Sequence, residues 1–131
     1  MRQLLYGLML PSGNDASLAL AVWCGRQLLI KDNEDLEKTI AMKNTETSLN
    51  TFTKNQCYSR FIKEMNVKAK TLNMTKTHYS NSHGLANIHN RSTAYDIAVL
   101  SAYCMKNAAF REIVSCKRYE CCVKYSLALP S

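Results

Sequence analysis

The chain has 131 residues, of which 47% are hydrophobic and 21% are charged, a balance typical of a folded globular domain. This composition excludes an intrinsically disordered chain, and the lack of a repeating period excludes collagen, coiled-coil and repeat architectures. No apolar run reaches the roughly eighteen residues that a membrane-spanning helix requires. Residues 1–10 are apolar but lack the small-residue cleavage site of a signal peptide, so we expect neither a membrane span nor an export signal.

The charge balance is basic, with 17 basic and 10 acidic residues and a formal net charge of +7. The basic residues concentrate in residues 60–76 and 106–124. A basic surface favours anionic partners, but no aromatic side chains interleave with these cations as a nucleic-acid stacking platform requires. We therefore expect no nucleic-acid partner and interpret the lysines as solvated helix faces. A nucleic-acid binder is an alternative that rests on charge alone.

The six cysteines and three histidines do not form a recognisable metal motif. No C-x-x-C pair occurs, and the histidines lack zinc-finger spacing. We expect no metal site and no cofactor. Six cysteines in a chain of this length are too few to indicate a disulfide scaffold, so the disulfide state and the redox compartment stay open.

The first part of the chain predicts two helices joined by a tight turn. Residues 2–10 form an apolar helix that Pro11 ends, because proline has no N–H to donate. Residues 12–14 form the turn, in which Gly13 is free to adopt an unusual backbone conformation. A second helix runs from residue 15 to residue 24 and is expected to face a core with its apolar residues, Leu18, Ala19, Val22 and Trp23.

Gly25 is expected to end this second helix, because glycine is the commonest residue just beyond a helix end. Residues 26–55 are polar and rich in Asp, Glu, Asn, Thr and Lys. We interpret them as an exposed insertion, with one helical turn near residues 36–42. A connection of this length is unusual in a compact domain and indicates function or flexibility.

Beyond the insertion, the pattern predicts three helices and one strand. The helices are residues 56–72, a helix that begins near Ser92 or Thr93, and residues 107–115. The strand is residues 118–127. Thr93 followed by Asp96 resembles a capping box. The helix after Thr93 carries a small-residue face, expected to pack closely, made of Ala94, Ile97, Ala98, Ser101, Cys104 and Met105.

Four stretches, in this order, resemble one known family. They are Ser-Gly-Asn at residues 12–14 between two apolar helices, RFIKEMNVKAKTLNM at 60–74, THYSNSHGL at 77–85 and RSTAYDIAVL at 91–100. Together they resemble the D-alanyl-D-alanine carboxypeptidases of the penicillin-binding protein and serine β-lactamase superfamily. A lone S-x-N match carries little weight, since residues 48–50 match it too, but four blocks in the same order are specific.

The resemblance implies a mainly α fold. It corresponds to the helical part of the α/β penicillin-binding fold, also called β-lactamase/transpeptidase-like, with most of the sheet absent. Residues 1–131 would form a partial catalytic domain with the polar insertion at about 26–55. Without the sheet an apolar face is left uncovered, so we expect an oligomer or a partner that covers it.

The resemblance also implies a chemistry. In the family, the serine of an S-x-x-K motif attacks the carbonyl between two D-alanines, and water releases the acyl-enzyme. By resemblance, Ser12 passes a proton towards the leaving amine, and Asn14 hydrogen-bonds the substrate amide. The alternative for both residues is a helix-capping turn. His83 is expected to be a locally bonded loop histidine, and Asp96 a helix-start residue.

Neither S-x-x-K nor K-T-G occurs in the chain. The nearest string, Thr51-Phe52-Thr53-Lys54, follows the S-x-N motif, whereas the family places its nucleophile before it. Loss of a covalent nucleophile costs about 10⁶ in rate in a serine protease, so we expect negligible turnover from the 131-residue polypeptide. The predicted partner is a D-Ala-D-Ala-type peptide. The alternative is a non-catalytic peptide- or glycan-binding module, and the cellular compartment stays open.

Overall fold

The computed structural model describes residues 1–33 and 52–121, and within these ranges it contains five helices and no β-strand. The helices are α1 (Arg2–Met9), α2 (Asn14–Asp32), α4 (Lys54–Thr71), α5 (Ala94–Cys104) and α6 (Ala108–Ser115). The predicted mainly α class is therefore confirmed for the described residues. None of their helices combines the length and the apolar character needed to cross a membrane.

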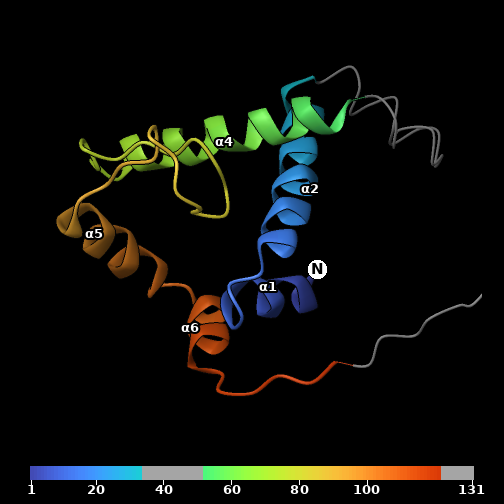
Figure 1. Ribbon diagram of the computed structural model, residues 1–131, viewed down its shortest axis with the longest axis vertical. Helices are drawn as coiled ribbons and strands as arrows, with labels where there is room; N and C mark the ends of the chain where they lie inside the picture. The colour runs from blue at the N-terminus through green and yellow to red at the C-terminus, as the bar shows by residue number, and fades with distance from the viewer. Residues whose placement is uncertain (34–51, 122–131) are drawn as a thin grey trace, which may run out of the picture.

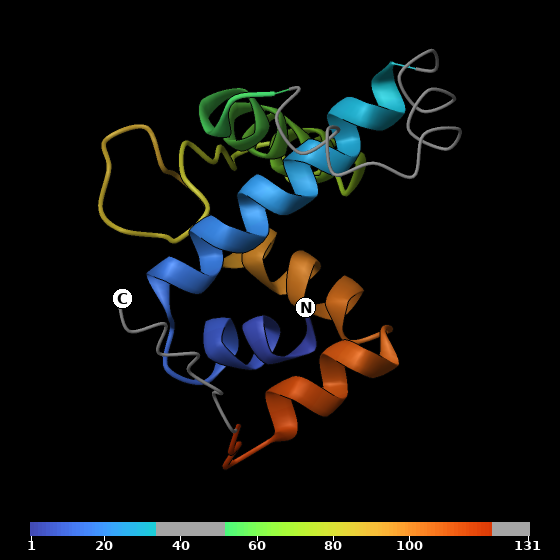
Figure 2. The same cartoon turned by 90° about the vertical axis from the view of Figure 1, so that its right-hand side faces the viewer.

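The helices follow one another around an open arc (Figure 1). Helix α2 packs across α4, and α1 and α6 lie together near the N-terminal end of α2. Helix α5 occupies the side of the arc between the far end of α4 and α6 (Figure 1). The loop of residues 73–91, which follows α4, reaches back beside the N-terminal half of α2 (Figure 2).

The contact between α2 and α4 depends on a glycine inside α2. A Cβ atom placed on Gly25 would lie 1.8 Å from the carbonyl oxygen of Cys57, so the two backbones meet without an intervening side chain. The prediction that Gly25 ends the helix is wrong, because this glycine serves close helix approach. Residues 26–32 continue α2, so the expected insertion begins later, and residues 34–51 lie outside the described residues, the turn expected near 36–42 included.

The predicted core face of α2 is also wrong. Leu18 and Trp23 are 48% and 50% exposed, whereas Leu20 and Ala21 are buried. Both sides of this helix are apolar, so periodicity alone could not choose between them. The side with the smaller residues packs on α4, because only small side chains allow the backbones to approach.

Helix α4 begins two residues earlier than predicted. Thr53 caps it in a capping box: its hydroxyl accepts a hydrogen bond from the Gln56 N–H at 3.2 Å, and its own N–H donates to the Gln56 side chain at 2.8 Å. The Thr53-Lys54 part of the S-x-x-K look-alike is thus a helix start. Thr51 lies outside the described residues.

Helix α5 begins at Ala94 with Thr93 as its N-cap, close to the predicted start, and the Thr93 hydroxyl accepts from the Asp96 N–H at 3.1 Å. The close packing expected of its small-residue face is not observed, because Asp96 is the buried residue of this helix and Ile97 is 43% exposed. Hydrogen bonds rather than apolar contact therefore hold the start of α5.

Helix α6 is capped by Asn107 and packs on α1, close to the predicted bounds. The buried ring of Tyr6 stacks on Tyr119, with ring centroids 3.9 Å apart, and its hydroxyl donates to Glu112 at 3.2 Å. The predicted strand is not observed in residues 118–121, and residues 122–127 lie outside the described residues. These contacts join the two ends of the described chain.

Candidate functional site

The turn between α1 and α2 takes its unusual conformation at Ser12 and not at Gly13. Ser12 has a φ of 55°, in the left-handed region that non-glycine residues seldom adopt, whereas Gly13 has a φ of −66°. The expectation for Gly13 is therefore wrong. Position 13 requires glycine because a side chain would not fit there. The Gly13 N–H donates to the Gly7 carbonyl at 3.1 Å, and an added Cβ would lie 2.5 Å from that oxygen.

Gly13 is also the N-cap of α2, and no side chain makes a capping hydrogen bond there. The capping alternative for Ser12 and Asn14 is therefore not what the structure shows. Ser12 is exposed in the turn, and Asn14 is the exposed first residue of α2. Both side chains remain available to a ligand.

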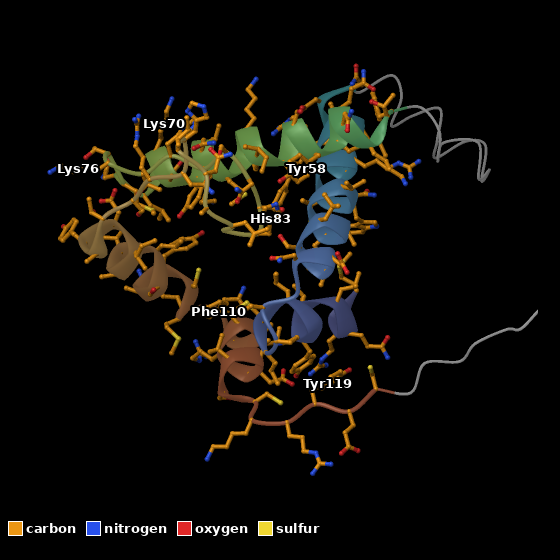
Figure 3. All side chains as sticks on the ribbon, viewed as in Figure 1. Tyr58, Lys70, Lys76, His83, Phe110 and Tyr119 are labelled. Carbon is orange, nitrogen blue, oxygen red and sulfur yellow. The ribbon has the colours of Figure 1, made fainter. Side chains whose placement is uncertain are left out.

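Ser12 and Asn14 lie in a groove of about 270 Å³, which we call the Ser12 groove. Its walls come from two parts of the sequence: α1, the turn and α2 form one, and the loop 73–91 forms the other. Figure 3 shows His83 on the loop, at the level of the first turns of α2. The lining residues are Leu8, Met9, Ser12, Gly13, Asn14, Ser17, Ser82 and His83.

Polar side chains of α2 and α4 hold the loop against this groove. The hydroxyl of buried Ser17 donates to that of Ser82 at 2.9 Å, and the Ser82 N–H donates to the Tyr58 hydroxyl at 3.1 Å. The Asn66 side chain pairs with the backbone of Tyr79, donating to its carbonyl at 2.7 Å and accepting its N–H at 2.9 Å. The groove wall is therefore anchored at two points along α4.

The loop is closed at its neck by an isolated antiparallel bridge. His78 and Arg91 exchange backbone hydrogen bonds of 2.8 and 3.0 Å. Inside the loop, the Asn90 side-chain oxygen accepts from the Ser80 N–H at 2.7 Å. The bridge and the Asn90 side chain together give the loop backbone hydrogen-bond partners in the absence of a sheet among the described residues.

Asp96 ties the start of α5 to the chain that follows α4. This carboxylate is 3% exposed, and it accepts from the Lys76 N–H at 3.1 Å and from the Thr77 hydroxyl at 2.7 Å. It also lies in the first turn of α5, where a negative charge is favourable. Asp96 is therefore a helix-start residue, as expected, and its anchoring of the chain at Lys76 and Thr77 is an additional finding. Burial, and secondarily the charge of Asp96, raises the pKa of Tyr79.

His83 makes a local hydrogen bond, as expected. Its Nδ1 accepts the Leu85 N–H at 3.2 Å, which leaves Nε2 as the ring atom free to act on a ligand. Gly84 beside it has a φ of 75°, in the region that glycine adopts without strain. The ring is thus oriented by its own turn while it borders the Ser12 groove.

Sequence reasoning missed the residues that build the groove around Ser12 and Asn14. Ser17 and Tyr58 lie in none of the four blocks, and polar residues on helix faces are usually solvated; Asn66 and Ser82 lie in the second and third blocks. The signal that could have found Asn66 is its place in the second of the four blocks. Among residues 1–33 and 52–121, no three His, Cys, Asp or Glu side chains gather as metal ligands do.

The comparisons with known proteins agree with this geometry. Residues 53–129 match the family model described as D-alanyl-D-alanine carboxypeptidase. The chain belongs to this family. It is 34% identical over 119 residues to the D-alanyl-D-alanine carboxypeptidase of Streptomyces sp. (strain K15), and 28% identical over 106 residues to D-alanyl-D-alanine carboxypeptidase DacF of Bacillus subtilis (strain 168).

These alignments cover 91% and 81% of the chain, but only 33% and 20% of the two relatives. Two solved structures of the Streptomyces K15 DD-transpeptidase, one of them a point mutant, superpose with a TM-score of 0.69 at 35% identity. Each superposition covers 90% of this chain and 36% of that enzyme. The chain thus has the helical part of the DD-peptidase fold and spans about a third of the length of these relatives or less.

Proposed function

We propose that residues 1–131 form one side of the catalytic cleft of a serine-type D-alanyl-D-alanine carboxypeptidase. Such a peptidase removes the terminal D-alanine of cell-wall-type peptides through an acyl-enzyme. The observation that carries the proposal is the Ser12 groove, where Ser12 and Asn14 lie beside Ser82 and His83. Two stretches that each resemble the family, and that are distant in sequence, converge there.

The chemistry of Ser12 and Asn14 suits this role. A hydroxyl can accept and donate a proton in the same step, so Ser12 would pass a proton towards the leaving amine. The Asn14 carboxamide has both donors and an acceptor and would hold the substrate amide in place. Both roles are supported by the absence of a side-chain capping hydrogen bond at the start of α2, so neither Ser12 nor Asn14 is used as a helix cap.

The polypeptide of residues 1–131 contains no S-x-x-K motif, so it would not form the acyl-enzyme by itself. Incubation with a labelled penicillin should leave it unlabelled under conditions that label a complete DD-peptidase. A stable adduct with this polypeptide would overturn this part of the proposal.

A chimera gives a direct test of the cleft. In the Streptomyces K15 relative, the aligned region would be replaced by the corresponding 119 residues of this chain. The rest of that enzyme would supply the motifs that this chain lacks. The chimera should react with labelled penicillin, and Ser12→Ala should slow acylation by about 10² or more, the range of a lost proton-transfer group. Asn14→Ala should also slow it.

The matched control is Ser59→Ala, which removes an exposed serine from α4 outside the Ser12 groove. It should leave acylation unchanged. If a folded chimera acylates equally well with Ser12→Ala and Ser59→Ala, the proposed role of Ser12 is wrong. A folded chimera that binds D-Ala-D-Ala peptides but never acylates favours the non-catalytic binding module.

A further inference from the structure

A second groove borders the Ser12 groove and shares Ser82 and His83 with it. Its volume is about 510 Å³, and its polar walls come from the loop 73–91 and its neck, including His78 and Arg91. None of the residues that line it is acidic. We call it the Arg91 groove.

His78 and Arg91 present two basic side chains to the same space. They exchange both backbone hydrogen bonds, so they are directly opposite each other in an antiparallel pair, and their side chains lie on one face. Neither side chain forms a hydrogen bond or ion pair with a described residue. The Arg91 guanidinium is therefore a cation that faces the groove without an anionic partner among the described residues.

The polar side chains of the Arg91 groove offer a ligand mainly donors: Arg91, the Ser82 hydroxyl, and the second amide hydrogens of Asn81 and Asn90, whose first hydrogens bond to the Leu85 carbonyl at 3.0 and 3.3 Å. The Asn81 and Asn90 side-chain oxygens are already engaged by the Gly84 and Ser80 N–H groups. The Ser82 oxygen accepts from Ser17, which leaves its own O–H to donate. A ligand that fits this groove therefore offers acceptor oxygens and negative charge.

We propose that the Arg91 groove binds a carboxylate group of a peptide held in the Ser12 groove, with the Arg91 guanidinium as its main partner. The peptide's presence in the Ser12 groove rests on the proposed function, but the affinity of the Arg91 groove for a carboxylate does not. The carboxylate is either the peptide's C-terminal group or an acidic side chain nearer its N-terminus.

The first experiment probes the groove without any peptide. Glutarate and its neutral analogue glutaramide are titrated into the 131-residue chain, and the NMR signals of the Arg91 side chain and the His78 ring are followed. Glutarate should shift both signals and glutaramide should not. Arg91→Gln should weaken glutarate binding about fivefold, the upper range for an exposed ion pair.

The matched control is Lys70→Gln, which removes one positive charge from exposed Lys70, a residue of α4 outside the Arg91 groove (Figure 3). It should leave glutarate affinity unchanged. Circular dichroism checks that both variants keep their helices. The proposal is overturned if glutarate and glutaramide shift the two signals equally, or if Arg91→Gln and Lys70→Gln have the same effect.

The second experiment identifies the source of the carboxylate. Four peptides that end in D-Ala-D-Ala carry either Glu or Gln upstream and either a free or an amidated C-terminus. If the carboxylate is an acidic side chain, the wild type should prefer the Glu peptides to the Gln peptides, and Arg91→Gln should abolish this preference. If it is the C-terminal group, the wild type should prefer the free acids to the amides, and Arg91→Gln should abolish that preference instead. If Ser12→Ala abolishes peptide binding while glutarate still binds, the two grooves act together.

If the chain binds glutarate at Arg91 but binds none of the four peptides, the proposed function fails and the carboxylate site stands. If the peptides bind and Arg91→Gln changes no preference among them, the carboxylate site fails and the proposed function is untouched.

Discussion

The α2–α4 crossing and helix α5 are held in opposite ways. At the crossing, the absent side chain of Gly25 lets the backbone of α2 rest against the carbonyl of Cys57, and Cys57 itself is 2% exposed. Helix α5 has Asp96 as its buried residue, while Tyr95 and Tyr103 are 75% and 45% exposed. One contact is apolar and tight, and the other is a hydrogen-bonded attachment.

The difference shows that the described residues bury the contact face of α2 and α4 by themselves but do not bury the apolar side chains of α5. Close approach at the crossing leaves no room for another element, whereas α5 shows large apolar side chains to solvent. The chain spans a third or less of the length of the two curated relatives, and we expect a partner or a second copy to cover the face of α5.

The largest effect should come from Gly25→Ala, which breaks the crossing. The added Cβ would lie 1.8 Å from the Cys57 oxygen, and neither backbone can yield without moving its helix. We expect a loss of about 3 kcal/mol or more in the free energy of unfolding, measured by urea denaturation.

Gly7→Ala is the matched control for this prediction. A Cβ at Gly7 would meet the Ala16 Cβ at 3.8 Å, an ordinary contact, within helix α1. Alanine should raise stability by about 0.5–1 kcal/mol, because glycine is the poorer helix former. If both variants change stability equally, the close crossing is not what holds α2 and α4 together.

A smaller and more local effect should follow from Asp96→Ala, which detaches α5. The substitution leaves the Lys76 N–H and the Thr77 hydroxyl without their buried acceptor, at a cost of about 2–3 kcal/mol. Amide hydrogen exchange should speed up in residues 94–104 and stay slow at the α2–α4 crossing.

Asp96→Asn keeps one acceptor oxygen and should lose less than Asp96→Ala. Uniform faster exchange throughout the chain after Asp96→Ala would contradict the comparison, because it would make α5 part of the same cooperative unit as the crossing.

Local sequence rules predicted most helices but failed where a tertiary contact decides. The helix at α4 was predicted correctly over most of its length, and Thr93 was identified as the start of α5. The sequence predicts a helix end at Gly25, because it cannot show which glycine a second backbone approaches. The same holds for Gly13, whose glycine is needed by its contact with Gly7 while Ser12 takes the positive φ.

The candidate site was predicted in its motif but not in its construction. Ser12 and Asn14 came from a resemblance, and the groove around them depends on Tyr58, Ser82 and Asn66, which meet only in the folded chain. A polar residue on a helix gives no sign of whether water or a distant loop is its partner. The roles of Ser12 and Asn14 stay predictions.

The smallest effect concerns the far end of the α2–α4 crossing, where Arg60 donates to Asp32 at 2.6 Å. This hydrogen bond, more than the other nearby charges, lowers the pKa of Asp32 below its usual range. Because the folded-state pKa is depressed, the pair stabilises the fold above the unfolded-state pKa of about 3.9 and loses this contribution as the pH falls through the folded-state value.

Arg60→Gln should therefore raise the pKa of Asp32, as followed by NMR titration of its side-chain carboxyl, and should flatten the pH dependence of stability below about pH 4. Glu64→Gln is the matched control, since it removes the other partner of Arg60, 2.9 Å away, and should leave the pKa of Asp32 lowered. Equal Asp32 pKa values in the wild type and Arg60→Gln would contradict the assignment of the lowered pKa to this pair. The exposure of Asp32 explains why the effect ranks last, because water and salt screen a surface pair that the buried crossing does not need.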